Sequence, residues 1–181
     1  MRIEDLMIDR SQTVAEQAAI LQNKLIAIRT SNRREIVSQF DKEEHRLEHV
    51  TQYQGVNFIN DSKSCTVNAT YYSFETITND IIWIAGGDDI AINYTELIGH
   101  VSQKVKTLVC IGENNQKLIK TFSNYIESIY EEQEMETAVR KAFYSAKKGD
   151  IVLLSTGCAC DELYPDYKMR GTAFKKAIAQ L

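Results

Sequence analysis

The chain has little of what interrupts regular structure and little that marks a secreted or membrane protein. Only one of its 181 residues is proline, Pro165, so long helices and strands can form without a break. No apolar run approaches the length of a membrane span, and the charged N-terminus, residues 1–10, lacks the apolar core of a signal peptide. Four cysteines are too few for a disulfide framework in a chain of this length. These absences predict a cytoplasmic protein that does not enter the membrane.

Clustered positive charge and two common phosphate-binding motifs are missing as well. Lys and Arg number 21 against 25 Asp and Glu, a net charge of -4, which argues against a nucleic-acid partner. No G-x-x-x-x-G-K-[ST] loop occurs, and no G-x-G-x-x-G follows the first predicted strand. The chain therefore carries neither a self-contained nucleoside-triphosphatase cradle nor a dinucleotide-binding fingerprint.

Apolar periodicity predicts a Rossmann-like α/β domain. Hydrophobic residues make up 44% of the chain, the usual share in a globular domain. Short apolar runs predict strands, and apolar residues three or four apart predict the helices between them. The strands are expected at 56–60, 81–85, 107–111, 128–130 and 151–154, and the helices at about 67–74, 97–105, 118–125, 139–146 and from 171 to the end. This alternation is typical of an open, mostly parallel sheet with helices on both faces.

The N-terminal residues are predicted to be helical and separate from that domain. Ser11 is a candidate helix cap, and Ser31 is a candidate cap for a second, short helix. Between them, apolar residues recur every three or four positions: Val14, Ala18, Leu21, Leu25 and Ile28. We predict a helical segment over residues 1–31 and one α/β domain over residues 32–181.

Polar loops follow four of the predicted strands and form the candidate site. Ligands of open parallel sheets bind at the carboxyl ends of the strands, where such loops meet. Any one loop can be an ordinary turn, and Asp61 can merely cap a helix, but four loops at one edge favour a binding site. The loops are 61–66, 86–89, 112–114 and 155–160. Before them, Arg46 could grip a phosphate, although spacing alone is explained as well by an exposed basic pair with His45.

Three ordered stretches resemble the C-terminal domain of the Mur ligase family, closest to UDP-N-acetylmuramoyl-L-alanine:D-glutamate ligase. The first joins residues 44–48 to residues 58–63 across a predicted turn at Gln54 and Gly55. The second is residues 83–88, and the third leads from residues 148–155 to Arg170, Gly171 and Phe174. The resemblance covers about residue 32 to the C-terminus, and residues 1–30 resemble the last helix of the family's central domain.

The resemblance implies an ATP-dependent amide-forming reaction in peptidoglycan precursor synthesis. ATP, with Mg²⁺, phosphorylates the carboxylate of the UDP-muramoyl peptide, and the amine of D-glutamate then attacks the acyl phosphate. On the matching positions, Asp61 would bind the ATP ribose, Arg46 a phosphate, and His45 would support the nucleotide. Gln12 stands where the family has the asparagine that meets the base. Lys63 would lie at the amino-acid site as the catalytic candidate.

Four positions on the amino-acid side depart from the family pattern. Cys65 replaces a threonine, Cys160 a serine, and Tyr167 a phenylalanine. Ile90 stands where the family has the lysine that holds the D-glutamate carboxylate, and losing that charge-assisted contact costs ~2 kcal/mol or more. These four remain the candidate substrate-binding positions. With Cys158, the two cysteines could form a soft-metal site or a labile disulfide, although a simple exchange of small residues is the simpler interpretation.

No phosphate loop or metal-binding motif is found, so we expect no ligase or ATPase activity from this chain alone. ATP and Mg²⁺ would be held mainly by a central domain that the chain lacks, and a separate polypeptide could supply the phosphate loop. Under this hypothesis the chain is a fragment, a truncated form or one part of a split D-glutamate ligase. The alternative is a diverged, non-catalytic module that binds a nucleotide or docks on a partner, or a remnant without function.

Overall fold

The computed structural model describes residues 43–87, 92–160 and 163–181, all within a unit that spans Phe40–Leu181. The predicted helical segment over residues 1–31, its boundary at residue 32, and the candidate residues Gln12 and Ile90 lie outside the described residues.

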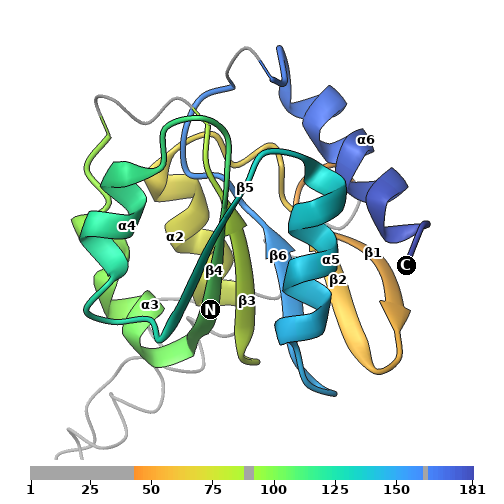
Figure 1. The fold of residues 1–181 in the computed structure, drawn as a ribbon, viewed down its shortest axis with the longest axis horizontal. Helices are drawn as coiled ribbons and strands as arrows, with labels where there is room; N and C mark the ends of the chain where they lie inside the picture. Colours follow the sequence, from red (N-terminus) through yellow and green to blue (C-terminus); the bar gives the residue numbers. More distant parts are fainter. Residues whose placement is uncertain (1–42, 88–91, 161–162) are drawn as a thin grey trace, which may run out of the picture. The chain divides into compact units, whose positions relative to one another are not determined.

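The described residues form a six-stranded sheet in the order β1-β2-β6-β3-β4-β5 (Figure 1). β1 pairs with β2 in the antiparallel direction, and all the other pairs are parallel. The predicted mostly parallel sheet is therefore confirmed. The strands are β1 (Glu48–Tyr53), β2 (Val56–Asn60), β3 (Ile81–Ala85), β4 (Val105–Ile111), β5 (Ser128–Glu132) and β6 (Ile151–Leu154).

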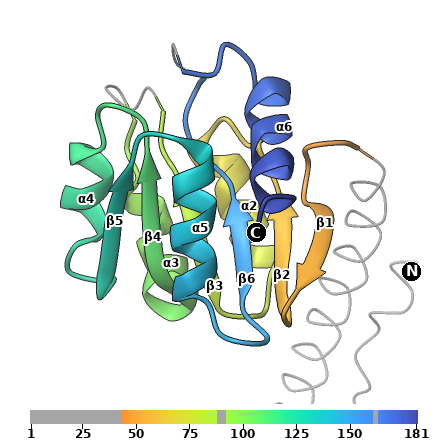
Figure 2. The same ribbon diagram turned by 45° about the vertical axis from the view of Figure 1, so that its right-hand side comes forward.

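Helices cover both faces of this sheet, as predicted. The 3-10 turn η2 (Thr95–Leu97) leads into α3, and the helices are α2 (Val67–Thr76), α3 (Ile98–Lys104), α4 (Gln116–Phe122), α5 (Met135–Ser145) and α6 (Tyr167–Ile178). Phe74 of α2, Val101 of α3 and Phe122 of α4 share one buried cluster, and Val139 of α5 and Phe174 of α6 belong to the other. Figure 2 shows α5 and α6 side by side on one face, with α2 behind the sheet.

Two predicted helix bounds are wrong for identifiable reasons. The helix expected over residues 97–105 ends at Lys104, because Val105 pairs with Ile81 in the sheet. The last helix begins at Tyr167 and not at Gly171, because the carboxylate of Asp166 caps it by accepting a hydrogen bond from Met169 N at 2.7 Å. The strands 56–60, 81–85 and 151–154 match the prediction.

The centre of the sheet is completely buried, which fixes the strand ends rigidly. Every residue of β3 and β6 is buried, and Trp83 Nε1 donates a hydrogen bond to Ser155 O at 2.6 Å, just past the end of β6. Apolar strands covered on both faces pack in this way in α/β proteins. Across the described ranges, no helix has the length and apolar character needed to span a bilayer.

Candidate functional site

The loops after β2, β6 and β3 meet at one edge of the sheet, as their strand order requires. Asp61 N donates to Leu154 O at 2.8 Å, and Ser155 N donates to Ile84 O at 3.1 Å. Gly157 N donates to Ser64 O at 3.1 Å, which ties the loop after β6 to the loop after β2. The predicted convergence of polar loops is therefore found for these three strands.

The carboxylate of Asp61 lies inside this edge and holds the surrounding loops. Asp61 is fully buried, and both of its carboxylate oxygens accept hydrogen bonds. Leu47 N donates to Oδ1 at 3.1 Å, while Ser73 Oγ and Ser155 Oγ donate to Oδ2 at 2.5 and 2.9 Å. Burial raises the pKa of Asp61 above its ordinary value, and the hydrogen bonds from Ser73, Ser64, Ser155 and Leu47 oppose that rise.

The loop that carries Arg46 has an unfavourable backbone conformation, and hydrogen bonds from neighbouring loops hold it in place. His45 and Leu47 have positive φ angles of 66° and 44°, which L-residues rarely adopt. Leu47 N is held by Asp61, and Lys63 N donates to His45 O at 2.9 Å. Residues in such conformations persist only where their surroundings fix them, and they gather at functional sites. The half-buried Arg46 is thereby presented from a constrained loop.

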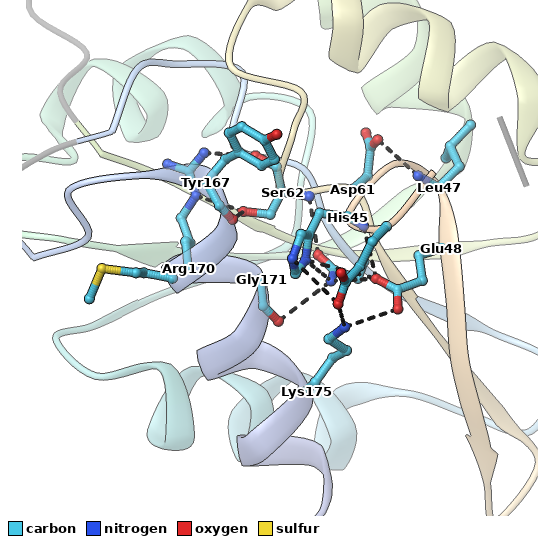
Figure 3. A network of polar contacts seen from close by, with 12 residues as sticks. His45, Leu47, Glu48, Asp61, Ser62, Tyr167, Arg170, Gly171 and Lys175 are labelled. Atoms are coloured by element: carbon cyan, nitrogen blue, oxygen red, sulfur yellow. Dashed lines mark hydrogen bonds and ion pairs between the residues drawn. The ribbon is translucent and has the colours of Figure 1, made fainter. Parts of the chain in front are cut away.

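His45 is the buried centre of a polar network (Figure 3). Asn60 Nδ2 lies 2.9 Å from His45 Nδ1 and donates to Glu48 Oε2 at 3.0 Å. Glu48 Oε2 also accepts from His45 N at 2.9 Å. Gly171 of α6 closes over the ring, since a Cβ there would lie 2.2 Å from His45 Nδ1. The network joins the start of β1, the end of β2 and α6.

Two lysines beside this network are paired with acids. Lys175 Nζ donates to Glu44 Oε1 at 2.6 Å and to Glu48 Oε1 at 3.1 Å. Burial lowers the pKa of Lys175, but its hydrogen bonds and charge contacts with Glu44 and Glu48 outweigh that effect, so the pKa is raised. Lys63 Nζ pairs with Glu43 and lies 5.8 Å from the centroid of the Tyr167 ring.

On the opposite side of Ser62 lies Arg170, whose side chain is 1% exposed. Its Nε donates to Ser62 Oγ at 3.1 Å, and its Nη2 donates to Ser62 O at 2.9 Å and to Cys65 Sγ at 3.3 Å. Ser62 Oγ in turn donates to Tyr167 O at 2.8 Å. Figure 3 shows the guanidinium beside Tyr167 and Ser62, away from the His45 network.

The thiols of Cys65 and Cys160 lie together beside this guanidinium. Cys65 Sγ accepts a hydrogen bond from Arg170 Nη2 at 3.3 Å, and both cysteines are partly exposed. Burial raises the pKa of Cys160, the charge of Arg170 opposes the rise, and Cys65 adds to it. In the part of the chain that the structure describes, no group of three metal-binding side chains gathers, so the soft-metal hypothesis has no support there.

The structure thus divides the predicted residues between two parts of one edge. His45, Arg46 and Asp61 lie around the loop before β1, whereas Cys65, Cys160 and Tyr167 lie around Arg170, and Lys63 stands between them. Sequence reasoning assigned no role to Glu48, Ser62, Ser73 or Ser155. Arg170 entered the sequence prediction only as part of a motif. Its spacing to Phe174 and Ile178, four and eight residues later, places it on the buried face of α6 and could have identified it as a buried charge.

Comparison with known proteins identifies the class to which this fold and site belong. Residues 45–158 match the model of the family described as Mur ligase, glutamate ligase domain, and the chain belongs to that family. Within it, the chain is similar to UDP-N-acetylmuramoylalanine--D-glutamate ligases. It is 40% identical to that of Christiangramia forsetii over 91% of this chain and 37% of the relative. It is 39% identical to that of Bacteroides thetaiotaomicron over the same shares. The chain therefore spans little more than a third of these relatives.

Solved structures share the fold at lower identity. The MurF ligase of Thermotoga maritima, in complex with ADP, superposes with a TM-score of 0.53 at 14% identity, over 77% of this chain and 32% of that one. The bifunctional folylpolyglutamate synthase/dihydrofolate synthase of Yersinia pestis gives a TM-score of 0.54 at 17% identity over the same shares. At these identities the likeness shows the fold alone.

Proposed function

We propose that this chain provides the C-terminal domain of an ATP-dependent ligase that adds D-glutamate to UDP-N-acetylmuramoyl-L-alanine in the cytoplasm. Identity of 38–40% to D-glutamate ligases over 91% of the chain is the observation that carries the proposal. Because the chain spans 37% of such a relative, the phosphate loop and the UDP-binding part belong to domains that precede it or to a separate polypeptide. The reaction would serve peptidoglycan precursor synthesis.

On the nucleotide side, the described residues fit ATP in part. Arg46 is half-buried on a constrained loop, where its guanidinium can meet a phosphate oxygen. The carboxylate of Asp61 has 0% exposure and already accepts hydrogen bonds at both oxygens, so a ribose hydroxyl would have to displace one of these donors. In the arrangement described, Asp61 acts on Arg46 as a positioning residue through Leu47 N. ATP, with Mg²⁺ bound mainly by the central domain, would supply the phosphoryl group that activates the acid.

On the amino-acid side, Lys63 is the residue best placed to exchange partners. Its side chain is 30% exposed and pairs with Glu43, whose side chain is 49% exposed. Exposed ion pairs contribute little to stability, so a substrate carboxylate can replace Glu43 at low cost. The Tyr167 ring near Lys63 Nζ would then cover one side of the bound amino acid. Lys63 therefore keeps the role of catalytic candidate.

A diverged, non-catalytic module is the second candidate function, and four changed amino-acid-side positions favour it. Cys65, Ile90, Cys160 and Tyr167 all differ from the pattern of the D-glutamate ligases that the sequence resembles. If these exchanges abolish amino-acid binding, the nucleotide-side network could remain as a binding or docking surface. The two functions differ in whether an amide product forms.

An assay in two parts separates these functions. The purified chain is incubated with ATP, Mg²⁺, D-glutamate and UDP-N-acetylmuramoyl-L-alanine, alone and together with a polypeptide holding the first two domains of the Christiangramia forsetii relative. We expect no phosphate release or amide product from the chain alone, because phosphoryl transfer needs the missing phosphate cradle and metal site. Amide product from the mixture that depends on Lys63 supports the ligase function. Assembly of the two polypeptides without product favours the non-catalytic module.

A further inference from the structure

Arg46 stands on a stretch of backbone that its own residues do not favour. The residues on either side of it, His45 and Leu47, have φ angles of 66° and 44°, although neither is glycine. Such conformations persist only where neighbouring groups fix them. The direction in which Arg46 leaves the loop therefore depends on the side chains that hold the backbone of residues 45–47.

Two carboxylates hold this backbone, one on each side of Arg46. Leu47 N donates a hydrogen bond to Asp61 Oδ1 at 3.1 Å, and His45 N donates to Glu48 Oε2 at 2.9 Å. Glu48 is the first residue of β1, so its side chain reaches back over the loop and closes it onto the sheet. Asp61 already has a place in the proposed nucleotide side, whereas Glu48 has none.

Donors from three different elements meet at the Glu48 carboxylate. Oε2 accepts from His45 N in the loop and from Asn60 Nδ2, at the end of β2, at 3.0 Å. Oε1 accepts from Lys175 Nζ of α6 at 3.1 Å (Figure 3). The side chain of Glu48 is 25% exposed, and hydrogen bonds to an ionised acceptor are shorter and stronger than neutral ones. The carboxylate is therefore fixed from the strand and the helix, and it fixes the loop in turn.

Asn60 extends this hold from the loop backbone to the His45 ring. Asn60 Oδ1 accepts from Ser62 N at 3.2 Å, so Nδ2 faces Glu48 Oε2 and lies 2.9 Å from His45 Nδ1. A flipped amide would set its oxygen against the carboxylate, so the hydrogen-bond pattern assigns its orientation. His45 Nδ1 then accepts from Asn60, and the neutral ring carries its proton on Nε2. Glu48 thus orients His45 both directly and through Asn60.

We propose that Glu48 is a positioning residue for Arg46, because its carboxylate sets the loop that presents Arg46 to a phosphate of the nucleotide. This inference rests on the proposed function, in which Arg46 meets a phosphate oxygen. Glu48 touches no substrate and acts through His45 and Asn60. Without its carboxylate, nucleotide binding would also have to order the loop, and the affinity would fall.

Glu44 provides the contrast on the same lysine. It accepts a hydrogen bond from Lys175 Nζ at 2.6 Å, as Glu48 does, but its side chain is 67% exposed. Glu44 Oε1 lies 3.7 Å from His45 Nε2, beyond hydrogen-bonding distance. Removing Glu44 therefore leaves the bonds to the backbone of residues 45–47 in place, which makes Glu44→Ala the matched control for Glu48→Ala.

The test titrates ATP with Mg²⁺ into the full 181-residue chain and follows the Arg46 Nε–H resonance by NMR. Glu48→Ala should weaken ATP binding about tenfold, the effect of one lost hydrogen bond in the loop. Glu48→Gln keeps an oxygen that accepts from His45 N, so its affinity should stay close to that of the wild type, as should that of Glu44→Ala. A merely structural effect would instead reduce the intensity of the folded resonances and leave the affinity of the folded molecules unchanged.

Couplings in the free chain report on the loop without any ligand. The three-bond couplings of HN to Hα and to Cβ at His45 show whether its φ is positive. We expect a positive φ in the wild type, Glu48→Gln and Glu44→Ala, and its loss in Glu48→Ala. Unchanged couplings or an unchanged ATP affinity in Glu48→Ala would refute the positioning role and leave the proposed ligase function intact.

The couplings also separate a failure of this inference from a failure of the proposed function. If the wild type binds no ATP at millimolar concentration, the nucleotide side of the proposed function is contradicted. The couplings then decide the role of Glu48 by themselves: loss of the positive φ in Glu48→Ala supports its hold on the loop, and an unchanged φ overturns it.

Discussion

The two halves of the candidate site satisfy their charges in opposite ways. Around the loop before β1, Lys175 meets Glu44 and Glu48, and the buried His45 meets Asn60 and Glu48. Around the first turn of α6, the buried Arg170 meets a hydroxyl, a carbonyl and a thiol. Among the described residues, the first half is complete in its charge pairing, whereas the second is incomplete because no described carboxylate pairs with Arg170. Changes in the packing of the first half should therefore appear mainly in stability, and changes in the second mainly in reactivity.

The largest effect in the complete half is expected from Gly171→Ala. The new Cβ would lie 2.2 Å from His45 Nδ1 and 3.0 Å from the side-chain amide of Asn60, so the buried network must shift. We expect the free energy of unfolding to fall by about 3 kcal/mol, the upper range for overpacking. Denaturant unfolding followed by circular dichroism measures it.

Gly99→Ala is the matched control for that substitution. Gly99 lies near the start of α3, and a Cβ there meets nothing within 4 Å, so alanine should stabilise the helix by about 0.5 kcal/mol. The two glycine variants should thus change stability with opposite signs. A Gly171→Ala protein as stable as the wild type would show that His45 and α6 are not tightly packed.

A smaller effect is expected from Asp61, with a characteristic pH dependence. Asp61→Ala leaves the half-buried Leu47 N without its acceptor, which should lower the free energy of unfolding by about 2 kcal/mol at neutral pH. Asp61→Asn keeps an acceptor for Leu47 N and removes the buried charge, so it should cost less than alanine. Denaturant unfolding of the two variants beside the wild type gives both differences.

The pH dependence follows from the raised pKa of Asp61. A raised pKa means that the folded state binds the proton of the Asp61 carboxyl more tightly than the unfolded chain does. The contribution of Asp61 to stability is therefore complete below its ordinary pKa of about 4, and it is lost as the pH rises through the pKa of the folded state. Asp61→Asn should remove this loss, so the difference between the two proteins should grow over that pH window. If the free energies of unfolding of the wild type and Asp61→Asn change in parallel with pH, the raised pKa of Asp61 is refuted.

The smallest effect on stability, but a large one on reactivity, is expected at the thiols of the incomplete half. Cys65 and Cys160 are partly exposed, whereas Cys110 and Cys158 are buried. An alkylating reagent should therefore modify the first pair in the folded chain and spare the second. Oxidised glutathione should join Cys65 to Cys160 with release of two reduced glutathione molecules, as mass spectrometry of the digested chain would show.

Serine variants and zinc define the limits of that prediction. Cys65→Ser or Cys160→Ser should abolish the intramolecular link with little change in stability, because serine fills a similar volume. Zinc should leave the alkylation rates unchanged, since no third metal ligand gathers with the two thiols among the described residues. Protection of both thiols by zinc, or equal labelling of Cys110, would contradict the arrangement of this half.

The sequence predicted the sheet well because its strands are buried on both sides. Ile81–Ala85 and Ile151–Leu154 are continuous apolar runs, and the structure has these strands with the expected bounds. The order β2-β6-β3 brought the polar loops together as expected. The start of α6 was missed, because Asp166 acts as its cap across a stretch that begins with Pro165, and capping depends on local geometry.

The site was only partly predictable for a different reason. Asp61, His45 and Cys65 stood out as residues in polar loops or in a resembling motif, but their partners come from distant positions. Ser73, Ser155 and Arg170 reach the site only once α2, β6 and α6 have packed against the sheet. Hydrogen bonds over such sequence separations leave no periodic signal in the sequence.

Domain exchange tests the central claim most directly: that this chain is the C-terminal domain of a D-glutamate-adding ligase. Residues 43–181 replace the matching domain of the Christiangramia forsetii ligase, and incorporation of labelled D-glutamate into UDP-N-acetylmuramoyl-L-alanine is measured in the purified hybrid. The hybrid should form the amide product with ATP, and Lys63→Met in the same hybrid should slow it. A folded hybrid that binds ATP but incorporates no D-glutamate would contradict the claim.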